Sequence, residues 1–162
     1  MKITIRKSTT DDYNDIYNLH IKCFDRTDQW YKTVIRECAH NGYVICTETK
    51  IIGVLLYSKI LPCCETETFI PENNMGKDFL KENKHHSNID GITMLCVHPK
   101  FRNKGFAQKL IKCYEPKEVC LNTRRSNPAY NLYIKMGYSH IGTIKEKYFL
   151  PTEDSMFMYK LN

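Results

Sequence analysis

The clearest chemistry in the sequence lies in a basic turn between a strand-like run and a helical stretch. The apolar run Gly91–His98 ends at Pro99, and residues 102–107 then read Arg-Asn-Lys-Gly-Phe-Ala before an amphipathic segment, 104–114. The N-terminus of a helix presents unpaired N–H groups and a partial positive charge, which bind phosphate. Gly105 lets the backbone come close to a ligand. The segment therefore predicts a phosphate-binding loop, to which Arg102 and Lys104 add cations.

A second segment with possible chemistry runs from Asn127 to Gly137 and contains Tyr133. A tyrosine hydroxyl has an ordinary pKa of about 10 and can act as a general acid toward a leaving thiolate. The alternative is a core aromatic residue whose hydroxyl lies at the rim, and composition alone favours that alternative. Tyr133 is a candidate general acid only in combination with the loop at 102–107.

Together, the two segments resemble the motifs of the GNAT acetyltransferase superfamily. In that superfamily, a strand, a proline and an R/Q-x-x-G-x-G/A turn hold the pyrophosphate of acetyl-CoA. An N-x-x-A-x-x-x-Y-x-x-x-G-F/Y segment forms the next motif. This chain has Asn127, Tyr133, Gly137 and Tyr138 in this segment, with one residue fewer between Asn127 and Tyr133 than the motif has, so that Ala129 lies one position earlier when counted from Asn127.

A narrower resemblance is to the catalytic subunits of protein N-terminal acetyltransferases. Those proteins read G-L-A-Q-K-L where this chain has Gly105–Leu110, and R-x-S-N-x-A-x-x-L-Y where it has Arg124–Asn127 and then Leu132-Tyr133. Their K-Y-Y and E-D-A-Y-x-M patterns are matched by Lys147–Phe149 and Glu153–Met158. The resemblance implies an enzyme that moves an acetyl group from acetyl-CoA directly to a primary amine, at a peptide or protein N-terminus.

The resemblance also implies roles for individual residues. The backbones of Leu95 and Val97 would position the pantetheine arm, and Asn127 would contact the cofactor beyond its thiol. Tyr133 would protonate the leaving thiolate. The acceptor would lie against Tyr148, Trp30 and Tyr31. The residues expected to hold the pyrophosphate are Arg102, Asn103, Lys104, Gly105, Phe106 and Ala107.

The general base is left open by the sequence. Several relatives carry a glutamate or histidine base at the position that is Asn122 here. Asp90, on the strand where another relative has a tyrosine base, is the first candidate, while Asp25, Asp28 and a water chain are alternatives. An aspartate near its ordinary pKa is a poor base for an ammonium group unless burial raises that pKa.

Other functions compete with this one. The competing acceptors are a lysine side chain and a small amine. An open acidic pocket lined by Glu65, Glu67 and Glu72 would favour a polyamine or aminoglycoside. A CoA-binding regulatory module without catalysis is kept open by Asn122. A nucleic-acid partner is disfavoured because the basic stretch Lys100–Lys112 has no interleaved aromatic residues and no recognised reading motif.

The elements that must position these residues form an α/β pattern. Hydrophobic periodicity and turn residues predict helices at 10–24, 29–40, 104–114 and 127–136, and strands at 2–6, 43–47, 51–61, 91–98, 118–122, 138–144 and 155–161. The resemblance implies the GNAT fold, with a mixed, mostly antiparallel central sheet of about seven strands flanked by about four helices. We expect one domain over residues 1–162, with a long insertion at about 62–88 between the third and fourth strands. Only Phe79-Leu80 suggests a short helical turn in that insertion.

Charge and composition agree with a globular enzyme. The chain has 162 residues and a net charge of +6, which divides into +2 over residues 1–60, −3 over 61–99 and +7 over 100–162. The basic last third contains the predicted phosphate loop, and a local positive field suits an anionic ligand. No apolar run approaches the roughly 20 residues of a membrane-spanning helix.

The eight cysteines indicate a reducing compartment. We expect them to be reduced and mostly buried, and we expect a cytoplasmic protein, with the nucleus as a further option and secretion disfavoured because the chain starts without an apolar leader. No metal is expected, since the spacing typical of zinc ligands is missing. The sequence does not decide between a monomer and a complex with an auxiliary subunit.

Overall fold

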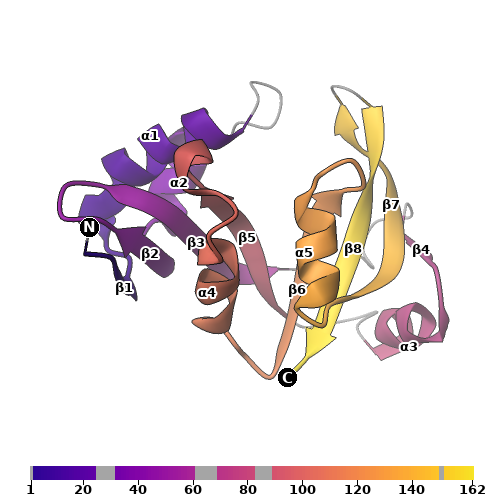
Figure 1. The fold of residues 1–162 in the computed structure, drawn as a ribbon. Coiled ribbons are helices and arrows are strands. Elements are labelled where there is room, and N and C mark those ends of the chain that lie inside the picture. Colours follow the sequence, from indigo (N-terminus) through magenta and orange to yellow (C-terminus); the bar gives the residue numbers. More distant parts are fainter. Residues whose placement is uncertain (1, 25–31, 61–68, 83–88, 150–151) are drawn as a thin grey trace. The chain divides into compact units, whose positions relative to one another are not determined.

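A computed structural model describes residues 2–24, 32–60, 69–82, 89–149 and 152–162 of the chain (Figure 1). The chain divides into two compact units. The first comprises Met1–Ser58 and Ile92–Glu115, and the second comprises Lys59–Gly91 and Pro116–Asn162. Each unit is described by itself below.

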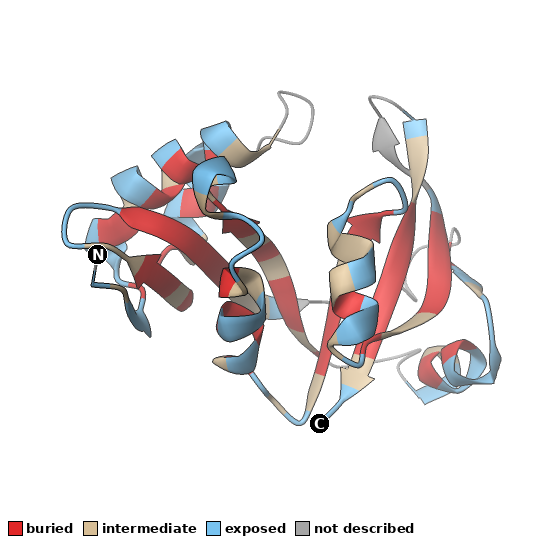
Figure 2. Ribbon diagram, viewed as in Figure 1, coloured by how far each residue is buried: buried red, intermediate tan, exposed pale blue. Residues whose placement is uncertain are grey.

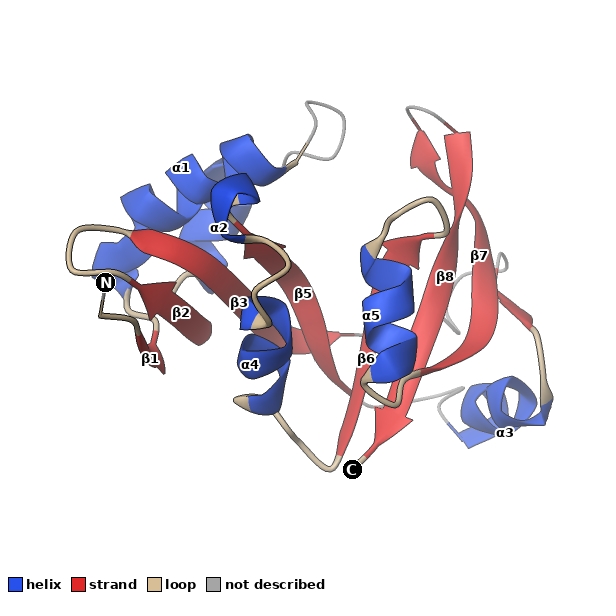
Figure 3. Cartoon of the chain, viewed as in Figure 1, coloured by secondary structure: helices blue, strands red, loops and turns tan. Residues whose placement is uncertain are grey.

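Among the described residues, the first unit carries the N-terminal strands together with α-helices (Figure 3). Its elements are β1 (Thr4–Lys7), α1 (Tyr13–Cys23), α2 (Lys32–Cys38), β2 (Gly42–Cys46), β3 (Ile51–Ile60, to Ser58), β5 (Ile89–Val97, from Ile92) and α4 (Phe106–Lys112). β1, β2 and β3 pair antiparallel in sequence order, and β5 follows β3 in the strand order. Short 3₁₀ turns precede α1, at Thr10–Asp12, and follow β5, at Pro99–Phe101.

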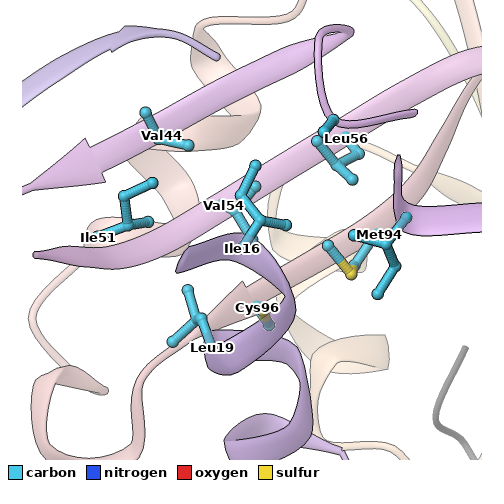
Figure 4. Close-up of a cluster of buried hydrophobic side chains, with 10 residues drawn as sticks. Ile16, Leu19, Val44, Ile51, Val54, Leu56, Met94 and Cys96 are labelled. Atoms are coloured by element: carbon cyan, nitrogen blue, oxygen red, sulfur yellow. The ribbon is translucent and has the colours of Figure 1, made fainter. Parts of the chain in front are cut away.

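The core of the first unit forms where α1 covers the strands. Ile16 and Leu19, one helical turn apart on α1, are buried against side chains of β2, β3 and β5 (Figure 4). The buried strand residues of this cluster are Val44, Ile51, Val54, Leu56, Met94 and Cys96. The exposed side of α1 is mostly polar, with Ile21 as an exposed apolar residue, and the buried apolar stripe fixes this helix against the strands (Figure 2).

The second unit is a set of antiparallel strands with two helices. Its elements, besides the ends of β3 and β5, are β4 (Phe69–Pro71), α3 (Asn74–Glu82), β6 (Glu118–Arg124), α5 (Ala129–Lys135), β7 (Ser139–Phe149) and β8 (Thr152–Leu161). β8 pairs with β6 on one side and with β7 on the other, and β4 pairs with β7. Phe157 of β8 is fully buried and packs against the rings of Phe69 and Phe79.

The described part of residues 62–88 contains more regular structure than the sequence indicated. β4 has only three residues and includes Pro71, which suits an edge strand but gives no strand pattern to read. α3 is a full helix because Phe79 packs on Phe157 at 5.3 Å and because Asn73 Oδ1 accepts the Gly76 N–H at 2.9 Å. The other predicted elements are present, with ends shifted by a few residues and with β7 extended to Phe149. Among the described residues, no helix is long and apolar enough to span a membrane.

Candidate functional site

The backbone at the end of β5 is hydrogen-bonded to β3 along one edge. The His98 N–H donates to the Ile52 carbonyl of β3 at 2.8 Å. Because backbone groups of successive residues alternate between the two edges of a regular strand, the N–H and C=O groups of Leu95 and Val97 point to the opposite edge. The Val97 carbonyl already accepts from Arg102 Nε at 3.1 Å and from Cys23 Sγ at 3.5 Å. The Val97 N–H points to this same edge.

The segment after β5 makes a tight turn into α4. The Lys100 N–H donates to His98 Nδ1, and the Arg102 N–H donates to the Pro99 carbonyl. Asn103 and Gly105 then adopt left-handed backbone conformations, with φ of 60° and 76°. Asparagine and glycine are the residues that tolerate this region best, which explains their presence in the turn. α4 begins directly after Gly105.

The surface around this turn is positively charged. Lys50 Nζ and Lys104 Nζ lie 5.8 Å and 5.5 Å from the centroid of the Phe101 ring. Partial burial, and then the charges of neighbouring lysines and of Arg102, lower the pKa of His98. Lys22 and Lys100 are among those lysines. The charge predicted for the last third of the sequence is thus joined here by cations from α1 and from the β2–β3 turn.

Arg102 is held by backbone carbonyls. Its Nε donates to Val97 O, and its Nη2 lies 3.4 Å from the carbonyl oxygen of Cys23, the last residue of α1. The guanidinium therefore ties the end of α1 to the end of β5. The residues Leu95, Val97 and Arg102–Ala107, all expected to bind one cofactor, lie together in the first unit.

The predicted residues Tyr133 and Asn127 belong to the second unit. Tyr133 is on α5, is only 6% exposed and packs edge-on against Tyr138 with 5.6 Å between ring centroids. Asn127 Oδ1 accepts the Ala129 N–H at 2.9 Å, so this side chain helps to begin the helix that carries Tyr133.

Asp90, the first candidate base, lies near the start of β5, in the second unit. Its Oδ2 accepts a hydrogen bond from Lys59 Nζ at 2.8 Å in a partly exposed ion pair. Asn122 Oδ1 accepts from the Ser155 hydroxyl at 3.1 Å, which gives this side chain a partner between β6 and β8.

Several predicted acceptor residues lie outside the described residues. These are Trp30, Tyr31, Asp25, Asp28, Glu65 and Glu67. The backbone of Tyr148 pairs with Glu153 in the β7–β8 hairpin, while its side chain is outside the described part. Glu72, proposed for an acidic pocket, accepts a hydrogen bond from the Thr143 hydroxyl at 2.7 Å.

Glu153 has a positioning contact that the sequence did not reveal. Its carboxylate accepts from the Ser126 N–H and the Ser126 hydroxyl, both at 2.8 Å, and pairs with Arg124 at 3.4 Å. These bonds, the Ser126 N–H first, lower the pKa of Glu153. The carboxylate thus fixes the turn that leads to Asn127 and α5. The E-D pattern was the only sequence signal for this residue, and it did not indicate the partner.

The residues of the turn fit an anionic cofactor such as acetyl-CoA. A Cβ built on Gly105 would meet only Gln108 Oε1, at 3.6 Å, so the space beside this backbone is open. Lys104 supplies a cation, and the Val97 N–H faces the strand edge. Among the described residues, no group of three or more histidine, cysteine or acidic side chains could hold a metal ion.

Comparison with known proteins identifies a family. The model of the acetyltransferase (GNAT) domain matches residues 39–140. No curated protein matches the chain.

Solved structures resemble this fold over nearly its whole length. NAA60 of Arabidopsis thaliana in complex with acetyl-CoA has 16% identity and a TM-score of 0.73, with coverage of 99% of this chain and 100% of that one. The ribosomal-protein-S18-alanine N-acetyltransferase of Escherichia coli has 14% identity and a TM-score of 0.72, covering 99% and 94%. The loading GNATL domain of CurA from Lyngbya majuscula has 11% identity and a TM-score of 0.77, covering 99% and 98%. The predicted α/β fold with mostly antiparallel strands is confirmed.

Proposed function

Because the chain belongs to the GNAT acetyltransferase family, whose model matches residues 39–140, we propose that it acetylates the N-terminal amine of a peptide or protein. The chain is an acyltransferase, and acetyl-CoA is its acetyl donor. The observation that carries the proposal is the turn from Arg102 to Ala107, in which Asn103 and Gly105 take left-handed conformations directly before α4.

The shape and charge of this turn support the proposed cofactor residues. Asn103, Gly105, Phe106 and Ala107 would offer backbone groups to the pyrophosphate, and Lys104 would add charge. Arg102 would act by holding the turn against Val97 and the end of α1, since its Nε and Nη2 are directed at carbonyl oxygens. Leu95 and the Val97 N–H would pair with the pantetheine arm, and Asn127 would contact the cofactor beyond the thiol.

The proposed reaction is a direct transfer. A neutral amine attacks the acetyl carbonyl, and backbone N–H groups stabilise the charge of the tetrahedral intermediate. Tyr133 then protonates the departing CoA thiolate. Asp90 stays the candidate base, with its Oδ2 held by Lys59, and a water chain is the alternative. No acyl-enzyme is required.

The acceptor class is supported by sequence patterns and by the names of similar proteins. The segments Lys147–Phe149 and Glu153–Met158, which resemble the N-terminal acetyltransferase patterns, lie on the two strands of the β7–β8 hairpin. One similar structure is named for acetylating the alanine of ribosomal protein S18. A reducing compartment such as the cytoplasm belongs to the proposal, because the six cysteines among the described residues are free thiols.

Matched peptides can separate the possible acceptors. The protein is incubated with acetyl-CoA and one of three acceptors, and CoA thiol release is followed. The first peptide has a free N-terminus and no lysine, the second has a blocked N-terminus and one lysine, and the third acceptor is a polyamine. We expect release above the blank only with free N-termini, and mass spectrometry should place the acetyl group on the α-amine.

The result that would overturn the acceptor class is faster release with the blocked lysine peptide or the polyamine. Acetyl-CoA binding without release for any acceptor would instead support the regulatory module. Binding of acetyl-CoA is measured separately by calorimetry. A failure of the proposed acceptor class can therefore be distinguished from a failure of the cofactor assignment.

A further inference from the structure

Two cysteine side chains meet where α1 ends against β5. Cys23 is the last residue of α1 and is half-buried, whereas Cys96 lies in β5 and is 6% exposed. Cys96 belongs to the core cluster of the first unit, and Cys23 packs against that cluster. Figure 4 shows the Cys96 side chain of β5 beside helix α1. One thiol therefore faces solvent in part while its neighbour is enclosed.

The surroundings of the pair differ in charge and in hydrogen bonding. The Cys96 thiol hydrogen-bonds to Cys23 Sγ, and this bond, together with the nearby Arg102 guanidinium, lowers the pKa of Cys23. The same hydrogen bond, and then burial, raise the pKa of Cys96. When it is protonated, Cys23 Sγ donates to the Val97 carbonyl at 3.5 Å. The negative charge of the pair is thus concentrated on the accessible sulfur.

We propose that Cys23 and Cys96 form a hydroperoxide-reactive dithiol, in which Cys23 is the attacking thiolate and Cys96 the resolving thiol. The Cys23 sulfur attacks one oxygen of hydrogen peroxide, the O–O bond breaks, and the leaving hydroxide takes a proton to become water. Cys96 sulfur then attacks the sulfenic acid of Cys23, and the displaced hydroxide takes the Cys96 proton. The two thiols lose two electrons to one peroxide, giving one disulfide and two waters.

The other described cysteines lack this combination. Cys113 Sγ donates to the Lys109 carbonyl of its own helix at 3.2 Å. Burial raises the pKa of Cys38 and of Cys46, which disfavours their thiolates. Cys120 is fully buried. The structure therefore distinguishes one pair from the cysteines that act as small apolar side chains.

The pair lies at the base of the basic turn. Arg102 donates to the carbonyl oxygens of both Cys23 and Val97, and the same Val97 oxygen accepts from the Cys23 thiol. A disulfide would remove the thiol proton that Cys23 donates to the Val97 carbonyl. The modification site is thus joined by hydrogen bonds to the turn that we assign to the cofactor, although its chemistry does not depend on acetyl transfer.

Peptide mapping of the full chain tests the pair. The reduced protein is treated with one equivalent of hydrogen peroxide, quenched with an alkylating reagent and digested without reductant. We expect a cross-linked peptide that joins Cys23 to Cys96. Cys23→Ser should abolish it, Cys96→Ser should leave a Cys23 sulfenic acid that dimedone captures, and the matched variant Cys113→Ser should keep the cross-link.

A rate measurement keeps the proposal testable if Cys96→Ser does not fold. At neutral pH, iodoacetamide should alkylate Cys23 of the unchanged protein about threefold faster than Cys38, whose pKa burial raises, since the larger thiolate fraction outweighs the lower nucleophilicity of a more acidic thiol. Equal rates at the two cysteines, or a peroxide-induced disulfide that omits Cys23 or Cys96, would overturn the proposal.

Discussion

Tyr133 has a natural control three residues earlier on the same helix, Tyr130. Tyr133 is 6% exposed, whereas Tyr130 is more exposed and packs against His140 with 6.2 Å between ring centroids. If Tyr133 is the general acid, Tyr133→Phe removes the proton donor but keeps the ring in its packing. We expect turnover to fall by about 100-fold, with acetyl-CoA affinity unchanged. Tyr130→Phe should alter turnover by less than about twofold, and thiol release with calorimetry checks both values.

An unchanged turnover in Tyr133→Phe would remove this residue from the mechanism. A fall in turnover that is matched by a fall in thermal stability would instead point to a packing role beside Tyr138. The comparison between the two phenylalanine variants is informative because both substitutions remove one hydroxyl from α5.

At the scale of single residues, the sequence predicted the types of side chain in the candidate site better than it predicted their hydrogen-bond partners. Arg102 was expected to contact pyrophosphate, and its guanidinium also donates to the carbonyl oxygens of Cys23 and Val97. Cys23 and Arg102 are far apart in the chain, so no local pattern can reveal their contact. The same holds for Glu153, whose partner Ser126 is brought close only when β6 and β8 pair.

At the scale of elements, the basic turn gives a prediction about Gly105. An alanine there would adopt φ near 76° at a cost of about 1 kcal/mol, and its methyl group would occupy space beside the backbone that the cofactor needs. We expect Gly105→Ala to weaken acetyl-CoA binding by at least about tenfold, or 1.4 kcal/mol. Gly137, with φ of 87°, is the matched control.

Gly137→Ala has the same backbone cost, and its Cβ would meet only the flexible Lys160 side chain at 3.5 Å. Both variants should therefore lose similar stability in urea unfolding, while calorimetry should show weakened binding for Gly105→Ala alone. Equal affinities in the two variants would contradict the assignment of this turn to the cofactor.

The contacts of Glu153 lead to a second prediction about elements. Glu153→Gln keeps the shape of the side chain but removes the charge that binds Ser126 and Arg124. We expect the free energy of unfolding to fall by about 1 kcal/mol. This is less than the contribution of a hydrogen bond to a fully buried charged group, because the Glu153 side chain is partly exposed. Asp154→Asn, which breaks an exposed pair with Lys145, should cost less than about 0.5 kcal/mol.

Urea unfolding of the two variants measures this difference. If Glu153→Gln were no more costly than Asp154→Asn, the carboxylate would not be holding the turn before α5. Turnover of Glu153→Gln should also fall more than that of Asp154→Asn, because the turn leads directly to Asn127 and to the helix of Tyr133.

Most elements could be predicted because their apolar periodicity is strong. Ile16 and Leu19 on α1 illustrate this, since both face the core cluster. β4 and α3 could not be located from sequence, because one is three residues long and the other depends on Phe79 packing against Phe157 of a distant strand. Long-range packing, rather than local propensity, decides such segments.

At the scale of the whole molecule, the charge distribution acquires a structural basis. The basic last third of the sequence supplies Lys100, Arg102 and Lys104 to the turn after β5, while Lys22 and Lys50 come from the first third. The sequence could predict the sign of this potential and the motif beneath it. It could not show that α1 and the β2–β3 turn add their cations to the same surface.

The stability of the whole protein should depend on pH through His20. This histidine is fully buried against Met94 and Phe24, and burial lowers its pKa below the ordinary value of about 6.5. The unfolded chain therefore binds a proton that the folded chain resists, so stability falls as pH decreases from about 6.5. The slope should approach about 1.4 kcal/mol per pH unit for this one group, until the folded pKa is reached.

A separate loss of folding stability should occur in more acidic solution. Asp12 and Glu153 have lowered pKa values, the first chiefly through its hydrogen bonds to Arg6 and the second through Ser126, so their contributions disappear only below a pH of about 4.5. Urea unfolding between about pH 5 and 7 isolates the histidine effect. His20→Gln should flatten the slope in that window, leaving the part due to His98, whose pKa is also lowered. The exposed His40→Gln should keep the full slope, and an equally steep slope in His20→Gln would show that burial of His20 does not control the pH dependence.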